Sequence, residues 1–145
     1  MNKNKIIIVC LFVPVFAFTA LSLVKIKNKH DFQQKVILAR QINAVLRSLM
    51  IDLSQIKESN ILDVPADGDW HDRVAFTKNG QGIFEYLIKD KYLFRNGNAQ
   101  SLMIADDIGS LRIRRQEQTP YILELQIVAQ NSVTLTSNLK IRVRE

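Results

Sequence analysis

Residues 38–56 read LARQINAVLRSLMIDLSQI, and apolar side chains recur in this stretch at steps of three and four residues. Such spacing lines up side chains along one face of an α-helix, whose period is about 3.6 residues. Neither glycine nor proline interrupts residues 31–61, and Gln33, Arg40, Arg47 and Ser54 fall on the opposite side. The sequence therefore predicts an amphipathic helix over residues 31–60, whose apolar stripe is made of Leu38, Ile42, Val45, Leu46, Leu49, Leu53 and Ile56.

Two interpretations of the start of this helix stay open. Asp31 can act as an N-cap, with Gln34 three residues later as its capping-box partner. Alternatively, the helix continues without a break from the preceding residues, because nothing between Val24 and Asp31 disfavours helix. At the other end, Pro65 and the run Asp67-Gly68-Asp69 predict a loop.

From Arg73 onward the apolar period changes to about 2, which is typical of strands. A hairpin turn is predicted at residues 78–82, and residues 101–108 are predicted to form a short excursion back across the sheet. The predicted strands cover residues 74–77, 83–88, 92–95, 111–114, 121–128 and 139–144. We therefore expect an α+β fold in which one long N-terminal helix packs on a single antiparallel β-sheet, a β-meander over residues 73–145.

An uncharged apolar run from Ile6 to Val24 precedes the helix. As a helix it would span about 28 Å, close to the hydrocarbon thickness of a bilayer, and it has no polar face. We interpret residues 1–30 as a membrane anchor with basic flanks and residues 31–145 as a soluble domain. A cleaved signal peptide is the alternative, with Ala20-Leu21-Ser22 as its candidate cleavage site. Cys10, the single cysteine, is interpreted as a small apolar residue of the anchor.

The positive charge of the chain is concentrated around this apolar run. Five of the 20 Lys and Arg residues bracket it, which leaves 15 basic against 14 acidic residues from Asp31 onward. Lysines at the ends of a membrane segment suit the headgroup region, so membrane lipid is the predicted partner of residues 6–24. Nucleic acid is not expected as a direct partner, because the folded domain is nearly neutral. Lysines on both sides leave the orientation undecided by charge.

No catalytic constellation is evident in the sequence. His30 lies in the lysine-rich flank, where a solvated or headgroup role is expected, and His71 has Asp72 beside it without a nucleophile motif. The glycines of residues 79–82 lie between predicted strands and serve a turn, not a phosphate loop. We therefore predict that the chain is not an enzyme, has no small-molecule substrate or cofactor, and contains no catalytic, cofactor-binding or metal-binding residue.

Two surface features allow a second interpretation. Asp63, Asp67, Asp69 and Asp72 fall within ten residues, so calcium binding is an alternative to a solvated turn, although the spacing is not that of an EF-hand. Trp70 in the same loop is interpreted as a packing residue at the domain edge.

Basic residues of the late strands are the other feature. If the strands carrying Arg112 and Arg114 and those carrying Lys140, Arg142 and Arg144 are neighbours, they form a basic stripe. The favoured interpretation is that Glu117 and Glu124 partly neutralise it as cross-strand pairs. The alternative is a docking face for an acidic partner protein.

Three segments of the domain resemble the minor pilins of the type IV pilin-like class. These are residues 72–76, residues 83–95 (IFEYLIKDKYLFR) and residues 102–113 (LMIADDIGSLRI), and the closing strand at residues 141–144 is similar to the final strand of that family. The resemblance is closest to J-type minor pseudopilins and F-type competence minor pilins, and it covers most of the chain. The chain departs from the family at the processing signal, since Lys5 precedes Ile6 without a glycine and the apolar run holds no glutamate.

The resemblance implies a non-catalytic subunit of a type II secretion, type IV pilus or DNA-uptake machine. It also implies other pilin-like subunits or secretion-machine proteins as partners. The expected place is the bacterial inner (cytoplasmic) membrane, crossed once, with the soluble domain outside the cytoplasm. The alternative function is a membrane-tethered extracytoplasmic accessory domain that binds a ligand or partner.

Overall fold

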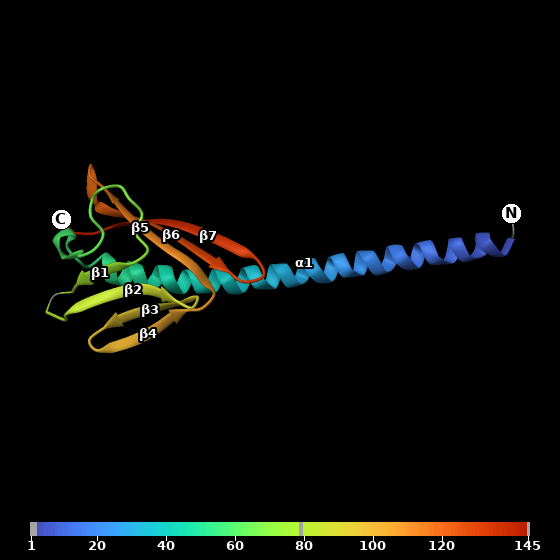
Figure 1. Ribbon diagram of the computed structural model, residues 1–145, viewed down its shortest axis with the longest axis horizontal. Helices are drawn as coiled ribbons and strands as arrows, with labels where there is room; N and C mark the ends of the chain where they lie inside the picture. The colour runs from blue at the N-terminus through green and yellow to red at the C-terminus, as the bar shows by residue number, and fades with distance from the viewer. Residues whose placement is uncertain (1–2, 79, 145) are drawn as a thin grey trace. The chain divides into compact units, whose positions relative to one another are not determined.

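The computed structural model describes the backbone of residues 3–78 and 80–144, and side chains from Ile26 onward except Asn79 and Glu145. Its residue contacts divide the chain into two compact units, Met1–Gln34 and Lys35–Glu145. One helix, α1, covers Lys3–Leu53, so Asp31 lies inside a helix and is not its N-cap (Figure 1). The predicted anchor at residues 6–24 lies outside the residues with described side chains. From Ile26 onward, no helix has a stretch long and apolar enough to cross a membrane.

The predicted end of the helix near Asn60 is wrong, because α1 ends at Leu53 and a separate 3-10 helix, η1, covers Glu58–Asn60. After the local bonds that close the last turn, the chain from Ile56 to Glu58 bonds to Arg144. The Arg144 backbone N–H donates to the Ile56 carbonyl at 2.9 Å, and the Glu58 N–H donates to the Arg144 carbonyl at 2.8 Å. These long-range hydrogen bonds replace the ones that another helical turn would have made.

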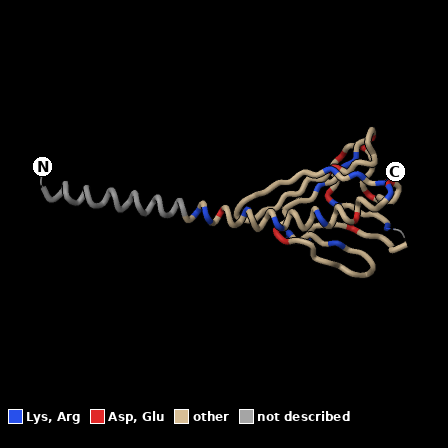
Figure 2. The backbone as a smooth tube through the Cα atoms, turned by 180° about the vertical axis from the view of Figure 1, so that it is seen from behind, with Lys and Arg blue, Asp and Glu red and all other residues tan. Residues whose placement is uncertain are grey.

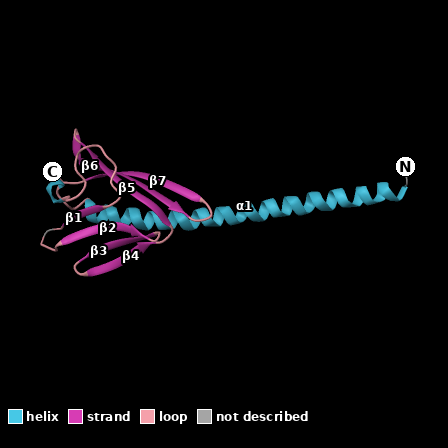
Figure 3. Ribbon diagram, in the orientation of Figure 1, coloured by secondary structure: helices cyan, strands magenta, loops and turns pink. Residues whose placement is uncertain are grey.

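Among the described residues, seven antiparallel strands follow α1, one more than the six predicted ranges. They form two sheets, one in the order β1-β2-β3-β4 and one in the order β5-β6-β7, so the prediction of a single sheet is wrong. The helix packed on antiparallel sheets is the α+β arrangement that the sequence predicted (Figure 3). The strands are β1 (Val74–Thr77), β2 (Ile83–Lys89), β3 (Tyr92–Gly97), β4 (Gln100–Ala105), β5 (Ile108–Gln116), β6 (Thr119–Gln130) and β7 (Thr134–Arg142).

The excursion predicted at residues 101–108 is also wrong, because most of that segment is strand β4, paired antiparallel with β3. Asn98 and Ala99 both have positive φ angles, 51° and 59°, and Gly97 pairs with Gln100 across them. Two residues of positive φ make the tight hairpin turn whose twist matches the flanking strands. An alanine is an uncommon choice there, so the sequence carries little sign of this hairpin.

The hydrophobic core lies between the last part of α1 and both sheets. Six residues of the predicted stripe are buried, namely Leu38, Ile42, Val45, Leu49, Leu53 and Ile56, and Leu46 packs against them half-buried. Alternate residues of the strands complete the core, among them Phe76, Tyr86, Leu111, Leu123 and Ile127. The amphipathic helix predicted from the spacing is therefore confirmed on its buried face.

Gly97 of β3 lies directly against the Phe84 ring of β2. A Cβ atom at this position would overlap the Phe84 ring, and the Arg95 guanidinium lies on the same ring, 4.5 Å from its centroid. We expect Gly97→Ala to lower the free energy of unfolding by about 1–3 kcal/mol, because the ring must leave its packed position. Urea titration of the full chain in detergent measures this, with Ala99→Ser as the control. Equal stability of Gly97→Ala and wild type would contradict the contact.

Candidate functional site

A buried carboxylate at the C-terminal end of α1 is the most densely bonded polar group described. Asp52 is 3% exposed and accepts hydrogen bonds from β2, from β3 and from the residue that follows β1. Arg95 of β3 donates from Nε at 2.5 Å and from Nη2 at 3.2 Å, and Tyr86 of β2 donates from its hydroxyl at 2.8 Å. Lys78, just after β1, donates at 3.2 Å. Ser48 lies 2.6 Å from the Tyr86 hydroxyl and completes what we call the Asp52 cluster.

The surroundings of Asp52, Tyr86 and Arg95 favour the ordinary charge state of each. Burial by itself would raise the pKa of Asp52, but the hydrogen bonds from Arg95, Tyr86 and Lys78 outweigh burial, and the pKa lies below its usual value. Burial raises the pKa of the Tyr86 hydroxyl, and the Asp52 hydrogen bond raises the pKa of Arg95. A carboxylate of lowered pKa between two cations is a weak base, and a buried tyrosine of raised pKa is a weak acid. The cluster therefore ties α1 to the sheet and is not suited to proton transfer.

Sequence reasoning missed the Asp52 cluster, although one signal was present. Asp52 follows Leu49 by three residues and precedes Ile56 by four, which places a carboxylate on the apolar stripe. A charge at such a position needs buried partners, because an unpaired one is costly. Those partners come from β2, β3 and the residue that follows β1, so no local pattern identifies them.

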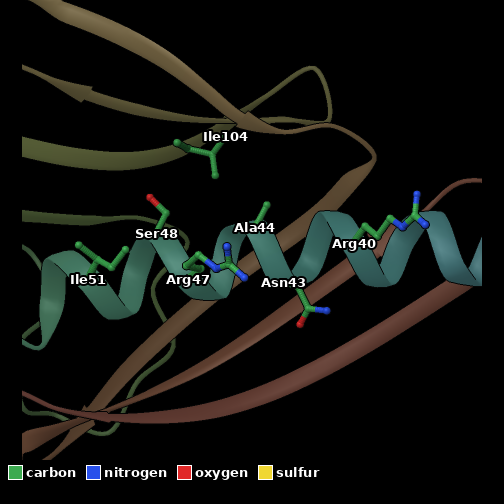
Figure 4. A pocket seen from close by; sticks show the side chains of 7 residues that line it. All are labelled: Arg40, Asn43, Ala44, Arg47, Ser48, Ile51 and Ile104. Atoms are coloured by element: carbon green, nitrogen blue, oxygen red, sulfur yellow. The ribbon is translucent and has the colours of Figure 1, made fainter.

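A groove of about 530 Å³ runs between α1 and β4, next to the Asp52 cluster. Figure 4 shows Ala44 and Ser48 pointing from α1 toward Ile104 of β4. The groove is lined by Arg40, Asn43, Ala44, Arg47, Ser48, Ile51 and Ile104. A second hollow of about 220 Å³ shares Ser48 and Ile51 with it and reaches Asp52, Arg95 and Leu102. We call the two hollows together the α1–β4 groove.

The α1–β4 groove combines apolar walls with unpaired positive charge. Ile51 is 54% exposed and Leu102 is 57% exposed, which is high for branched apolar side chains of a folded domain. Arg40 and Arg47 are exposed, and neither has an ion pair within the side chains described from Ile26 onward. Such a surface suits a ligand that carries apolar groups and carboxylates.

The histidines and the acidic loop do not assemble a reactive site. His30 is exposed, and His71 Nε2 lies 3.6 Å from Asp67 Oδ1 while its backbone exchanges two hydrogen bonds with Ile113 of β5. Asp63 accepts from the Ala75 N–H at 2.6 Å, away from Asp67. Among the described residues, no three His, Cys, Asp or Glu side chains are placed to hold a metal ion.

Trp70 and the basic residues of the late strands are partly paired with one another. Trp70 is 40% exposed, and the Arg114 guanidinium lies 4.5 Å from its ring centroid, so this side chain packs at the domain edge.

The strands that carry Arg112 and Lys140, β5 and β7, are not neighbours, because β6 lies between them. The basic stripe that needed them side by side is therefore wrong.

Glu124 of β6 pairs with both flanking strands. Its carboxylate lies 2.7 Å from Arg114 of β5 and 2.7 Å from Lys140 of β7, and the hydrogen bonds from Lys140 and Arg114 lower its pKa. Glu117, the other predicted partner, is exposed in the turn between β5 and β6. Arg142 lies over the Tyr121 ring, 5.1 Å from its centroid. Figure 2 shows basic and acidic positions interleaved along residues 35–144.

Comparisons with known proteins identify no relative of this chain. No protein-family model, no curated protein and no solved structure matches the chain. The Asp52 cluster and the α1–β4 groove are accordingly the features of the described residues that bear on function.

Proposed function

We propose that the chain is a non-catalytic minor pilin-like or pseudopilin-like subunit of a type II secretion, type IV pilus or DNA-uptake machine. In this proposal residues 6–24 hold it in the cytoplasmic membrane and pack beside other subunits, and the domain lies outside the cytoplasm. The observation that carries the proposal is the buried stripe of α1 against antiparallel sheets, in a chain whose α1 also includes the apolar run.

Two further observations support a structural role. The buried polar groups of the Asp52 cluster are bonded to one another and serve packing, not chemistry. The residues that resemble the minor-pilin segments, 83–95 and 102–113, form β2 and parts of β3, β4 and β5, so the likeness falls on the scaffold of the domain.

The test is an anchor exchange in the organism that encodes the chain. Deleting the gene should lower secretion, piliation or DNA uptake at least about tenfold, and the full chain should restore it. A hybrid in which residues 1–30 are replaced by an unrelated single-pass anchor of equal length should reach the membrane and fail to restore the process. The reason is that helix-to-helix packing in a bilayer depends on the particular side chains at the contact.

A membrane-tethered accessory domain that binds a partner is the second candidate, and the α1–β4 groove favours it. That candidate needs the anchor only as a tether. Full rescue by the hybrid, with equal membrane content in fractionation and equal protease accessibility of the domain, would contradict the pilin-like proposal and support the accessory domain.

A further inference from the structure

Strand β4 is an open edge of the four-stranded sheet. Among the strands that the structure describes, only β3 pairs with it, and its register is set by the two-residue turn that closes on Gly97 and Gln100. The closing pair of such a turn is hydrogen-bonded, and bonded pairs alternate along an antiparallel ladder. Ser101 and Met103 therefore direct their backbone N–H and C=O groups away from β3, toward the open edge.

The sheet stops short of covering the flank of α1 that faces this edge. Figure 1 shows β2, β3 and β4 running alongside the part of α1 after residue 35. On the inner face of β4, Leu102 and Ile104 line the α1–β4 groove, opposite Ala44 and Ile51 of α1. A fifth strand added at the edge would cover this apolar surface and satisfy the unpaired backbone groups.

The charges at the groove select among possible fifth strands. Arg40 and Arg47 lie seven residues apart on α1, about 10 Å along its axis. Along one face of a strand, side chains i and i+2 are about 7 Å apart, and side chains i and i+4 are about 13 Å apart. Carboxylates at positions i and i+4 of an added strand therefore reach the two guanidinium groups, with position i+2 between them near Ile104.

A second copy of β4 does not supply those carboxylates. Residues 100–105 read QSLMIA and include no acidic side chain. An edge-to-edge dimer through β4 would leave both arginines unpaired on each copy. The charge complementarity therefore favours a different protein as the source of the strand.

We propose that the β4 edge and the α1–β4 groove form a docking site for an extended segment of a partner protein. The segment adds to β4 as a fifth antiparallel or parallel strand, and its inward face reads acidic–apolar–acidic. The apolar side chain enters the groove between Ala44 and Ile104, and the two carboxylates pair with Arg40 and Arg47. This inference does not depend on the pilin-like proposal, since either candidate function can use such a site.

The experiment titrates fluorescein-labelled peptide TETVTET, capped at both ends, against the full chain in nonionic detergent and follows fluorescence anisotropy. Saturable binding is expected, and the lysine peptide TKTVTKT is expected to bind at least about tenfold more weakly because like charges meet at the groove. The Arg40→Gln, Arg47→Gln double variant should weaken binding of TETVTET about tenfold. Both arginines are exposed and unpaired among the described side chains, so folding should be unchanged.

The edge itself is tested with a matched pair of variants at Met103. Met103→Pro removes an N–H that points away from β3, where an edge strand tolerates proline, and Met103→Ala removes the side chain and keeps the N–H. Met103→Pro should weaken binding at least about tenfold, and Met103→Ala should retain it. Far-ultraviolet circular dichroism and urea midpoints confirm that both variants are folded.

Three results would overturn the docking site. The first is no saturable binding of TETVTET, and the second is equal binding of TKTVTKT. The third is a concentration-dependent dimer in sedimentation that Met103→Pro abolishes and the double arginine variant keeps, because a second copy of the chain would then occupy the edge.

Discussion

Replacing Asp52 with asparagine is expected to lower the free energy of unfolding by about 2–4 kcal/mol, because it leaves two cations without their anion. The Asp52 side chain is 5% exposed, and those of Arg95 and Lys78 are 25% and 22% exposed. Asparagine keeps the shape of the side chain but removes the charge. The two cations stay partly solvated, which places the expected loss toward the lower end of the range known for broken buried pairs.

The stability difference between wild type and Asp52→Asn should depend on pH. The pKa of Asp52 is lowered in the folded chain, so its contribution to stability is present above the ordinary carboxyl pKa of about 4. That contribution is lost as the pH falls through the lowered value. Wild type and Asp52→Asn should therefore differ most near pH 7 and converge at the acidic end.

Urea titrations of the full chain in detergent, at a series of pH values from 7 to 3, measure both effects. Asp67→Asn is the matched control, since Asp67 is exposed and accepts its hydrogen bond from the Asp69 N–H. We expect that control to stay within about 0.5 kcal/mol of wild type. If Asp52→Asn behaves like the control at pH 7, the Asp52 cluster does not stabilise the fold.

Truncating Leu49 to alanine is the second large effect, an expected loss of about 3–4 kcal/mol of unfolding free energy. Leu49 is fully buried at the middle of the α1 stripe, where core residues of both sheets contribute to the same cluster. The substitution loses apolar burial and leaves a cavity that two sheets held on one helix cannot close by a small shift.

Met50→Ala on the next residue is the control for Leu49→Ala. Met50 is 50% exposed, and alanine has the higher helix propensity, so its effect on stability should be under about 0.5 kcal/mol. Thermal unfolding followed by circular dichroism should show a drop of at least about 10 °C for Leu49→Ala. Similar melting temperatures for the two variants would mean that α1 does not pack on the sheets through this stripe.

Much of the secondary structure follows from the local apolar pattern. The strands that were predicted with wrong bounds, or not at all, also have local causes. Residues 74–77 form β1 as predicted, and residues 83–88 lie within β2, because alternation there reflects one buried face. β7 begins at Thr134, earlier than predicted, because its first residues are mostly polar and show no apolar alternation. β4 was missed because five of its six residues are not buried, so burial imposes no period on them.

The candidate site was largely outside the reach of sequence reasoning. The α1–β4 groove depends on where β4 lies relative to α1. The Asp52 cluster depends on β2, β3 and the residue after β1 meeting one helix end. Arg114, Lys140 and Glu124 were singled out in the sequence, and the pairing through Glu124 is confirmed.

The sequence by itself determined the helix stripe, the change of period after Arg73 and the α+β class, because each is set by which side chains must leave water along one element. Only the tertiary structure decided that the strands divide into two sheets, that α1 ends at Leu53, and that Asp52 is paired inside. The helix end and the pairing of Asp52 depend on hydrogen bonds and ion pairs between residues 26 or more positions apart, whose partners no local pattern specifies.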